Sequence, residues 1–421
     1  MSRPNNIAST TRRFDAVIVG GGPTGLTAAL LATTLGRTVA LVASARPEDE
    51  RTTALLAGSV GLFERIGVWN EIAANAAPLR RIRIADASGR LIRAPEILFD
   101  SAEIGIEAFG YNISNRALTD ILDRTVDARG VERFPAAAET IIPDEKAVHI
   151  ETADRVSLDA RLAVAADGRH SKTREAAGIG VREWQYDQSA LVVNLRHALP
   201  HDDISTEFHT PTGPFTLVPL PGNRSSLVCV ETADGAARLA ELSDAELADE
   251  IERRSASILG AVEIDGPRQV FPLSGMRAER FAAGRIALVG EAAHVIPPIG
   301  AQGLNLGLCD VAELAEMLAG GPDSDPGAPA RLAGFDRRRR SDILGRTAVI
   351  DGLNRSLLTD SLLVQGVRGL ALTALDRIPP LRRAVMRQGI AALGILDRKP
   401  VEAPLAGHGK RSAGKIRLPI R

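Results

Sequence analysis

The sequence predicts an α/β fold built on a doubly wound parallel sheet, with an inserted antiparallel sheet and helices at the carboxyl end. A short apolar strand, a glycine-rich turn, a helix and a second strand follow one another over residues 14–42, which is the order of a βαβ unit. The apolar runs 162–166 and 285–289 predict further buried parallel strands. Residues 80–113 and 185–232 instead alternate apolar and polar residues around turns, as antiparallel strands do.

Length and composition are those of an ordinary globular enzyme-sized chain. The 421 residues are enough for two or three packed subdomains. A net charge of −1 argues against a nucleic-acid surface, which needs a basic excess on one face. Cys229 and Cys309 are too few for a disulfide framework or a thiolate metal site. We therefore expect a protein of the reducing cytoplasm without a metal centre.

Residues 16–36 carry no charge and follow Arg12 and Arg13, so they resemble a secretory signal or a membrane helix. The glycines at 20–22 and Gly25 would break such a helix, and small-residue cleavage spacing is not evident. No other stretch is apolar for about 18 residues, the minimum for a spanning helix. We expect no segment that crosses a bilayer.

The elements of the first unit can be assigned individually. Residues 14–19 form the first strand, and a helix follows from Pro23 to Leu35, because proline suits a first helical turn and Gly36 a helix end. Residues 38–42 form the second strand. Farther along, the sequence predicts helices at 116–129, 243–258 and 311–318, a loop at 320–329, helices with basic faces over 331–397, and a flexible tail from 402.

The turn after the first strand matches G-x-G-x-x-G through Gly20, Gly22 and Gly25. The first glycine makes the tight turn, the second lets a pyrophosphate approach the backbone, and the third allows close helix–strand packing. The pattern favours dinucleotide binding over a purely structural turn. The acidic residue usual at the end of the second strand is missing, because Ala43 and Ser44 stand there; Ser44 can offer a ribose one uncharged hydrogen bond.

Two later motifs lie where ligands bind in open parallel sheets. The strand 285–289 leads into Glu291 and His294, and a turn rich in proline and glycine then runs to a helix start, which can stabilise an anionic cofactor ring. The other motif lies between this one and the glycine-rich turn: the strand 162–166 ends at Asp167 and Gly168.

With three motifs in this order, over roughly residues 14–350, the chain resembles the flavin-dependent aromatic hydroxylases, the group that includes p-hydroxybenzoate hydroxylase. Within that group it is most similar to the ubiquinone-biosynthesis hydroxylases. The resemblance implies a Rossmann-like FAD-binding domain in three parts, residues 1–78, 113–180 and 273–345. It also implies substrate-sheet strands at 79–112, a substrate domain at 181–272, and C-terminal helices with a flexible basic tail at 346–421.

The resemblance also implies roles for individual residues. Gly20, Gly22 and Gly25 would hold the pyrophosphate, Arg51 would reach back to FAD, Asn115 would contact the cofactor, and Asp167 with Gly168 would form the family's Asp-Gly motif. Glu291 would bond the ribityl chain, Pro298 would line the oxygen side of the ring, Gly303 would expose its backbone N–H near the helix start, and Leu304 and Asn305 would contact the ring edge.

Glu291 stands where the family usually has aspartate. The extra bond lengthens the side chain by about 1.5 Å, enough to spoil a fixed hydrogen bond unless the turn shifts. Ala43 alters a second contact to the cofactor's hydroxyls. We therefore expect FAD to bind and to be lost during purification.

The implied chemistry belongs to the cofactor: reduced flavin reacts with O₂ to a C4a-hydroperoxide, which transfers a hydroxyl to an electron-rich ring. A second dinucleotide fingerprint is absent, so NAD(P)H is expected to bind transiently as the electron donor. No base can be named, since Tyr111, Tyr186 and His209 in the predicted substrate sheets and His294 in the turn are expected to be packing, surface or structural residues.

Other functions remain open. The substrate could be a polyprenyl phenol of ubiquinone biosynthesis or a soluble aromatic compound, and the chain could instead be a non-catalytic flavin-fold subunit of a quinone-synthesis complex. A halogenase is disfavoured because Trp69 and Trp184 form no Trp-x-Trp motif. The basic, partly apolar residues 361–395 and the acid-free residues 407–417 could contact the inner membrane from the cytoplasm, or could be a solvated helix and a frayed tail.

Overall fold

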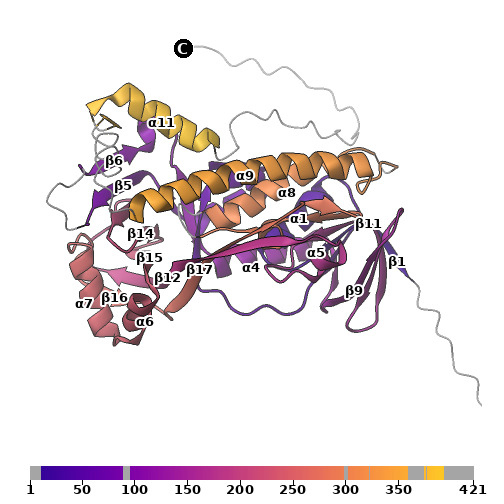
Figure 1. Ribbon diagram of the computed structural model, residues 1–421, viewed down its shortest axis with the longest axis horizontal. Coiled ribbons are helices and arrows are strands. Elements are labelled where there is room, and N and C mark those ends of the chain that lie inside the picture. Colours follow the sequence, from indigo (N-terminus) through magenta and orange to yellow (C-terminus); the bar gives the residue numbers. More distant parts are fainter. Residues whose placement is uncertain are drawn as a thin grey trace, which may run out of the picture.

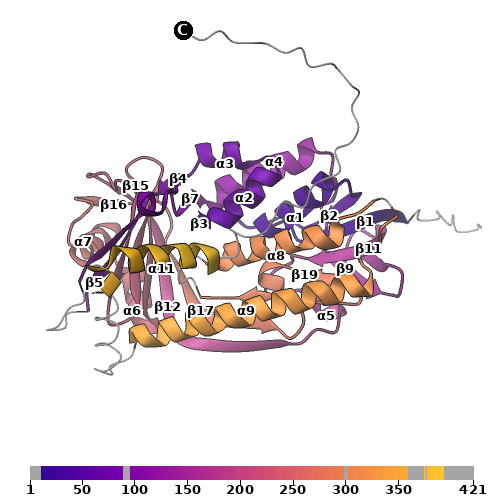
Figure 2. The same ribbon diagram turned by 90° about the horizontal axis from the view of Figure 1, so that it is seen from above.

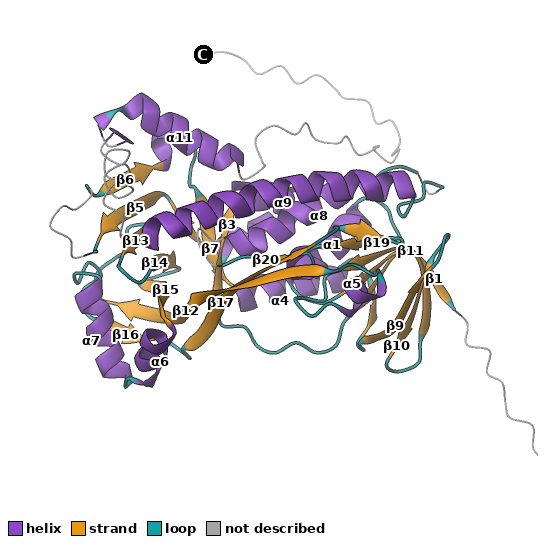
Figure 3. Cartoon of the chain, viewed as in Figure 1, coloured by secondary structure: helices purple, strands orange, loops and turns teal. Residues whose placement is uncertain are grey.

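The computed structural model describes residues 11–88, 95–297, 302–321, 323–358, 374–375 and 377–392. Within this part of the chain, two large sheets lie toward opposite ends of an elongated molecule, and long helices run along one side (Figure 1). One sheet is predominantly parallel and the other predominantly antiparallel (Figure 3). This arrangement confirms the predicted α/β fold.

The parallel sheet carries the βαβ unit. In spatial order its connected strands are β18 (Ala282–Ala283), β19 (Ile286–Leu288), β11 (Ser157–Ala165), β1 (Arg12–Val19), β2 (Val39–Val42) and β8 (Glu132–Phe134). Parallel pairing joins β19, β11, β1, β2 and β8. Ile18 of β1 therefore lies between Val164 of β11 and Leu41 of β2. The carboxyl ends of these strands meet at one edge, which is where the site lies.

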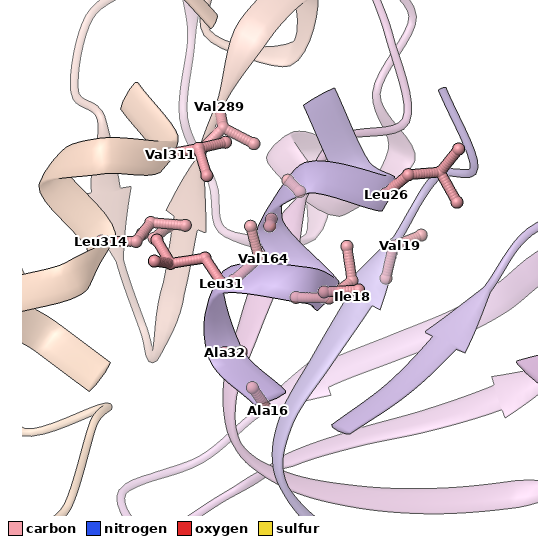
Figure 4. Close-up of a cluster of buried hydrophobic side chains, with 14 of the residues drawn as sticks. Ala16, Ile18, Val19, Leu26, Leu31, Ala32, Val164, Val289, Val311 and Leu314 are labelled. Atoms are coloured by element: carbon pink, nitrogen blue, oxygen red, sulfur yellow. The ribbon is translucent and has the colours of Figure 1, made fainter. Parts of the chain in front are cut away.

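Helix α1 (Pro23–Thr34) connects β1 to β2 and is buried from Gly25 to Ala32. A helix that is apolar all round needs cover on every side. The sheet supplies one side, and α8 (Gln302–Leu318) supplies another. Leu31 of α1 lies among Val311 and Leu314 of α8 in this core (Figure 4). The chain leaves α1 through Gly36 in the left-handed region, at φ +75°, as the sequence predicts.

Smaller elements extend this half of the molecule. The strands β9 (Ala138–Pro143) and β10 (Val148–Thr152) form an antiparallel hairpin, and β10 pairs antiparallel with β11; this hairpin is absent from the elements predicted above. A separate three-stranded sheet consists of β3 (Thr52–Leu56), β7 (Gly110–Ser114) and β4 (Ala77–Leu79). Helices α2 (Ala57–Arg65) and α3 (Trp69–Ala74) lie between β3 and β4 in the chain, and α4 (Asn115–Ala128) follows β7.

The antiparallel sheet forms the other half. In spatial order its strands are β20 (His294–Val295), β17 (Gln269–Ala278), β12 (Val181–His197), β15 (Arg224–Thr232), β14 (Pro214–Leu220), β13 (Ile204–His209), β5 (Arg81–Asp86) and β6 (Ile97–Asp100), and β16 (Val262–Ile264) also pairs with β12. The strands predicted in 185–232 are present. Within 80–113, β5 pairs antiparallel with β6 as expected, but its pairing with β13 is parallel. β17 crosses the predicted boundary between 272 and 273, and β20 joins this sheet from within the predicted 273–345 segment.

One face of the antiparallel sheet packs against α6 (Ala233–Glu241) and α7 (Asp244–Arg254), and Leu191, Phe215 and Leu227 are buried in the resulting core. Helix α7 begins with a capping box: Ser243 accepts from the Glu246 backbone, and the Glu246 side chain accepts from the Ser243 backbone. Such reciprocal bonds satisfy backbone groups that a helix start leaves unpaired.

Two long helices and α11 complete the described chain. Helix α9 (Pro329–Leu358) lies alongside α8 and runs toward the antiparallel sheet (Figure 2). Helix α11 (Pro379–Ala392) packs Met386 against Phe109 and pairs Arg382 with Glu103 at 2.8 Å. The predicted basic tail lies outside the described residues. Among the helices that the structure describes, none is long and apolar enough to cross a membrane.

Candidate functional site

An open cleft of about 840 Å³ lies at the carboxyl ends of β1, β2 and β11. This is the edge of a parallel sheet where ligands bind, and the volume is typical of a cofactor site. The cleft is lined by residues 19–23, 42–49 and Arg51, by Asn115, Arg116, Thr119 and Asp120, by residues 137–138 and 166–168, by His170 and Lys172, and by Gln269 and Phe271.

The glycine-rich turn forms the floor of the cleft. Gly20 has φ +117°, and a Cβ there would lie 2.2 Å from the Ala166 carbonyl oxygen. A Cβ on Gly25 would lie 2.0 Å from the Gly20 carbonyl oxygen. Gly22 differs, because a Cβ there would meet nothing within 4 Å. The space beside Gly22 is therefore open to a ligand, at the start of a helix whose N-cap has no side-chain hydrogen bond.

The end of β2 places Ala43 and Ser44 in the cleft, without the carboxylate usual for a ribose. Arg46, which the sequence analysis missed, also lines the cleft. Its guanidinium donates to the Gly21 carbonyl oxygen and lies 3.3 Å from the Asp123 carboxylate. A cation thus lies over the glycine turn, where the negative charge of a pyrophosphate would lie.

Arg51 and Asn115, both predicted site residues, are held by Asp49. Arg51 donates twice to the Asp49 carboxylate, at 2.8 and 2.7 Å, and Asn115 Nδ2 donates to it at 2.9 Å. Burial alone would raise the pKa of Asp49, but these hydrogen bonds outweigh it and lower the pKa. The Arg51 guanidinium also lies 5.2 Å from the ring centre of Phe271. This set brings the loop after β2, helix α4 and β17 together.

Asp167 and Gly168 line the cleft, but the Asp167 carboxylate is engaged by its own loop. It accepts hydrogen bonds from the Ser171 hydroxyl and from the Thr173 backbone and hydroxyl, the latter two at 3.1 and 2.9 Å. These bonds order the first turn of α5 (Lys172–Ala176). In this structure Asp167 shapes the wall of the cleft.

The predicted Glu291 lies on a 3-10 turn, η2 (Gly290–Ala292), and is exposed. It is not among the residues that line the cleft, but its carboxylate is near Arg51. The pKa of Arg51 is raised, first by its hydrogen bond to Asp49 and additionally by the charge of Glu291. Arg174 connects this turn to the Asp-Gly loop, since it donates to the Arg169 and Ala292 carbonyl oxygens at 2.9 and 3.0 Å.

Gly303, Leu304 and Asn305 form the first turn of α8 and also lie outside the cleft lining. Gly303 is exposed and Leu304 is half-buried, whereas Asn305 is buried. Asn305 Oδ1 accepts from the Leu56 backbone at 2.9 Å and from the Ser59 hydroxyl at 2.6 Å, and its Nδ2 donates to the Ala54 carbonyl oxygen at 2.8 Å. The Asn305 side chain therefore links the start of α8 to β3 and α2 by hydrogen bonds. Pro298 lies outside the described residues.

The three motifs meet where glycines allow close packing. A Cβ on Gly290 would lie 3.1 Å from Thr24 Oγ1, and a Cβ on Gly307 would lie 3.0 Å from both Thr24 Oγ1 and Gly290 Cα. Together with the contact between Gly20 and Ala166, these approaches join the glycine turn, the Asp-Gly loop, the η2 turn and α8. Segments far apart in the sequence are thus packed against one another beside the cleft.

None of the side chains considered as a base lines the cleft. Tyr111 packs edge-on against Trp69, with ring centres 4.9 Å apart, and burial raises its pKa. Tyr186 accepts from Trp184 Nε1 at 2.8 Å, and His209 lies 2.9 Å from the Glu207 carboxylate.

Comparison with known proteins agrees with this geometry. The family model described as FAD binding domain matches residues 13–341. The ubiquinone hydroxylase UbiL of Rhodospirillum rubrum is 36% identical over 403 residues, covering 93% of each chain. The 3-demethoxyubiquinol 3-hydroxylase of Escherichia coli is 28% identical, covering 90% of this chain and 99% of the relative. The crystal structure of the p-nitrophenol 4-monooxygenase PnpA from Pseudomonas putida DLL-E4 has the same fold, with a TM-score of 0.74 at 20% identity, covering 92% of this chain and 100% of that one.

The match to the FAD binding domain over most of the chain, together with a cleft at the carboxyl edge of a parallel sheet, identifies an FAD-binding protein. The chain belongs to the FAD-binding monooxygenase family that is like p-hydroxybenzoate hydroxylase, and it is an enzyme, a flavin-dependent monooxygenase.

Proposed function

We propose that this monooxygenase hydroxylates the aromatic ring of a polyprenyl phenol in ubiquinone biosynthesis. The observation that carries the proposal is the similarity along almost the whole chain to ubiquinone hydroxylases, including UbiL at 36% identity. The similarity extends to the 3-demethoxyubiquinol 3-hydroxylase of E. coli and to the human ubiquinone biosynthesis monooxygenase COQ6, at 28% identity each.

The residues at the cleft fit FAD. The open space beside Gly22 suits the pyrophosphate, Arg46 would offset its charge, and Ser44 would take the ribose. Arg51 and Asn115, already oriented by Asp49, would bind farther along the cofactor, with Glu291 near its ribityl chain. When bound and reduced, FAD supplies the oxygen chemistry. The protein's part is to orient the cofactor and the phenol and to exclude water.

We further propose the identity of the electron donor and the strength of FAD binding. NAD(P)H is the electron donor and binds transiently, because the sequence has one dinucleotide fingerprint, at Gly20–Gly25. FAD is retained weakly, since Ala43 and Glu291 replace two contacts of the family. Stoichiometric yellow flavin surviving extensive dialysis would contradict weak FAD retention.

The proposed reaction can be tested with purified protein supplied with FAD. A prenylated phenol of the ubiquinone pathway is expected to stimulate NADH or NADPH oxidation and to gain one oxygen atom by mass spectrometry. Stimulation by p-hydroxybenzoate or another soluble phenol alone would favour the soluble-substrate alternative. No stimulation by any phenol would contradict the proposed reaction. A deletion strain should accumulate the unhydroxylated quinone intermediate, whose structure identifies the ring position.

A polyprenyl substrate resides in a bilayer, and we propose that α11 contacts it as a peripheral surface. Leu381 and Val385 of this helix, and Ile378 just before it, follow helical spacing and are 41, 40 and 47% exposed, respectively. Arg383 and Arg387 are exposed on the same helix, which has no acidic residue. Exposed apolar side chains combined with arginines are typical of helices that lie in an anionic lipid interface.

Replacing Leu381 and Val385 by glutamate is expected to abolish flotation with anionic vesicles, because both the apolar insertion and the charge attraction are lost. The matched control is Leu344→Glu on α9, since Leu344 is similarly exposed, at 44%, and lies on another helix. The control should float like the unmodified protein. Equal flotation of all three proteins, or flotation that does not depend on anionic lipid, would rule out α11 as the contact surface.

A further inference from the structure

A buried charged cluster lies directly behind the turn that carries Glu291. Asp310 of α8 is 0% exposed, and His294 of β20 and Arg339 of α9 are each 3% exposed. The Asp310 carboxylate accepts hydrogen bonds from the Gly290 backbone at 2.8 Å, from His294 Nε2 at 2.7 Å and from Arg339 Nε at 2.6 Å. One carboxylate thus joins the η2 turn, β20, α8 and α9.

A carboxylate without access to water is costly unless its oxygens are fully paired. Burial alone would raise the pKa of Asp310, but the charges of His294 and Arg339 and the hydrogen bonds from His294 and Gly290 outweigh it, so the pKa is lowered. The pKa of Arg339 is raised by Asp310 and by Asp342 despite its own burial. Asp310 is therefore held ionised, as the strongest form of acceptor for the Gly290 N–H.

The hydrogen bond from the Gly290 backbone to Asp310 fixes the position of the η2 turn. Gly290 is in the left-handed region, at φ +61°, and lies close to α1 and α8: a Cβ on Gly290 would lie 3.1 Å from Thr24 Oγ1, and a Cβ on Gly307 would lie 3.0 Å from Gly290 Cα. The next residue is Glu291, which is exposed and near Arg51. The Gly290 amide is hydrogen-bonded to Asp310, and α1 and α8 lie close to Gly290. Asp310 therefore fixes the backbone from which the Glu291 side chain extends.

We propose that Asp310, supported by His294 and Arg339, is a positioning residue for FAD: it holds the 290–292 turn so that Glu291 faces the cofactor. The inference rests on the FAD site proposed above. It assigns a role to three residues that do not line the cleft. It also accounts for glutamate at 291, where the family usually has the shorter aspartate. Because Asp310 holds the neighbouring Gly290, the backbone at 291 is fixed and the longer side chain can keep one direction.

The test compares Asp310→Asn with Asp325→Asn. Asp325 also forms an ion pair with an arginine, Arg285, at 2.9 Å, but this pair is only half-buried and lies on the loop after α8, away from the cleft. Both variants should lower the stability of the apoprotein. FAD affinity, measured by the change in flavin fluorescence, should fall at least about tenfold for Asp310→Asn. For Asp325→Asn it should change by less than about twofold.

Combination with Glu291→Gln separates positioning from general destabilisation. If Asp310 acts through Glu291, Glu291→Gln should weaken FAD binding strongly in the unmodified protein and little further in the Asp310→Asn background, a non-additivity typical of coupled residues. Additive effects, or an unchanged FAD affinity in Asp310→Asn, would overturn the proposal.

If Asp310→Asn does not accumulate as folded protein, His294→Ala provides the same test, since it removes one partner of Asp310 and leaves the Gly290 bond. It should weaken FAD binding at least about threefold and be equally non-additive with Glu291→Gln; an FAD affinity equal to that of the unmodified protein would overturn the proposal. None of these measurements uses a phenol, so they are independent of the proposed substrate, and failure of the unmodified protein to bind FAD would instead refute the site itself.

Discussion

Replacing Gly25 by alanine is expected to destabilise the apoprotein by at least about 3 kcal/mol. The new Cβ would lie 2.0 Å from the Gly20 carbonyl oxygen and 3.2 Å from the Ala166 Cβ. The first contact is with backbone, which cannot rotate away as a side chain can. Relief therefore requires α1 to move from β1 and β11, and this movement disrupts the largest core of the molecule. Urea denaturation of the FAD-free protein measures the loss.

Gly61→Ala is the matched control for this substitution. Gly61 lies in α2, and a Cβ there would meet nothing within 4 Å. Alanine is the better helix former, so the control should be as stable as the unmodified protein or about 0.5–1 kcal/mol more stable. Equal stability of the Gly25 and Gly61 variants would show that α1 does not approach β1 as closely as described.

Gly22→Val is expected to leave the apoprotein nearly intact and to weaken FAD binding at least about 100-fold. The position beside Gly22 is empty in the protein alone, and its backbone is extended, at φ −72°. A Cβ therefore meets no neighbour here, and we expect the valine side chain to cost below about 1 kcal/mol, as for an unfavourable N-cap residue. The same side chain would occupy the space of the pyrophosphate and keep it from the amides of α1.

Two measurements on the same preparation decide this prediction. Denaturation without cofactor should give nearly the stability of the unmodified protein, and titration with FAD should give the weakened affinity. If the variant binds FAD normally, the pyrophosphate does not lie at Gly22 and the cleft holds the cofactor in another way. The opposite effects expected at Gly22 and Gly25, three residues apart, separate the binding role of the turn from its packing role.

The elements that could be predicted from the sequence are those specified by short-range patterns. The first strand, the glycine turn, α1 and β2 follow from an apolar run, glycines at fixed spacing and a proline at a helix start. The strands β11 and β19 were visible as short apolar runs for the same reason. The hairpin of β9 and β10 was not predicted. Residues 148–152 of β10 alternate apolar and polar side chains, but 138–143 of β9 do not, so the sequence offers no matching pair of strand patterns.

The candidate site could be predicted in part. Gly20, Gly22, Ser44, Arg51, Asn115, Asp167 and Gly168 line one cleft, whereas Gly25, Glu291, Gly303, Leu304 and Asn305 do not. Asn305 illustrates the limit of the motif. Its place in the sequence predicts a contact with the ring edge, and that role remains a prediction, but its buried hydrogen bonds to Ala54, Leu56 and Ser59 could not be inferred without the fold.

The sequence by itself determined the α/β class, the order of the three motifs and the glycines at which backbone meets backbone, because strand, turn and helix patterns are set by neighbours a few residues apart. Only the tertiary structure decided that Asp49 would orient Arg51, that Arg46 would cross the glycine turn, and that Asp310, His294 and Arg339 would meet behind Glu291. Apart from the local pair of Asp49 and Arg51, these contacts join residues that lie 16 to 29 positions apart in the sequence. A buried charge leaves no periodic signal in the sequence, since its stability depends on partners that the folded chain alone brings within hydrogen-bonding distance.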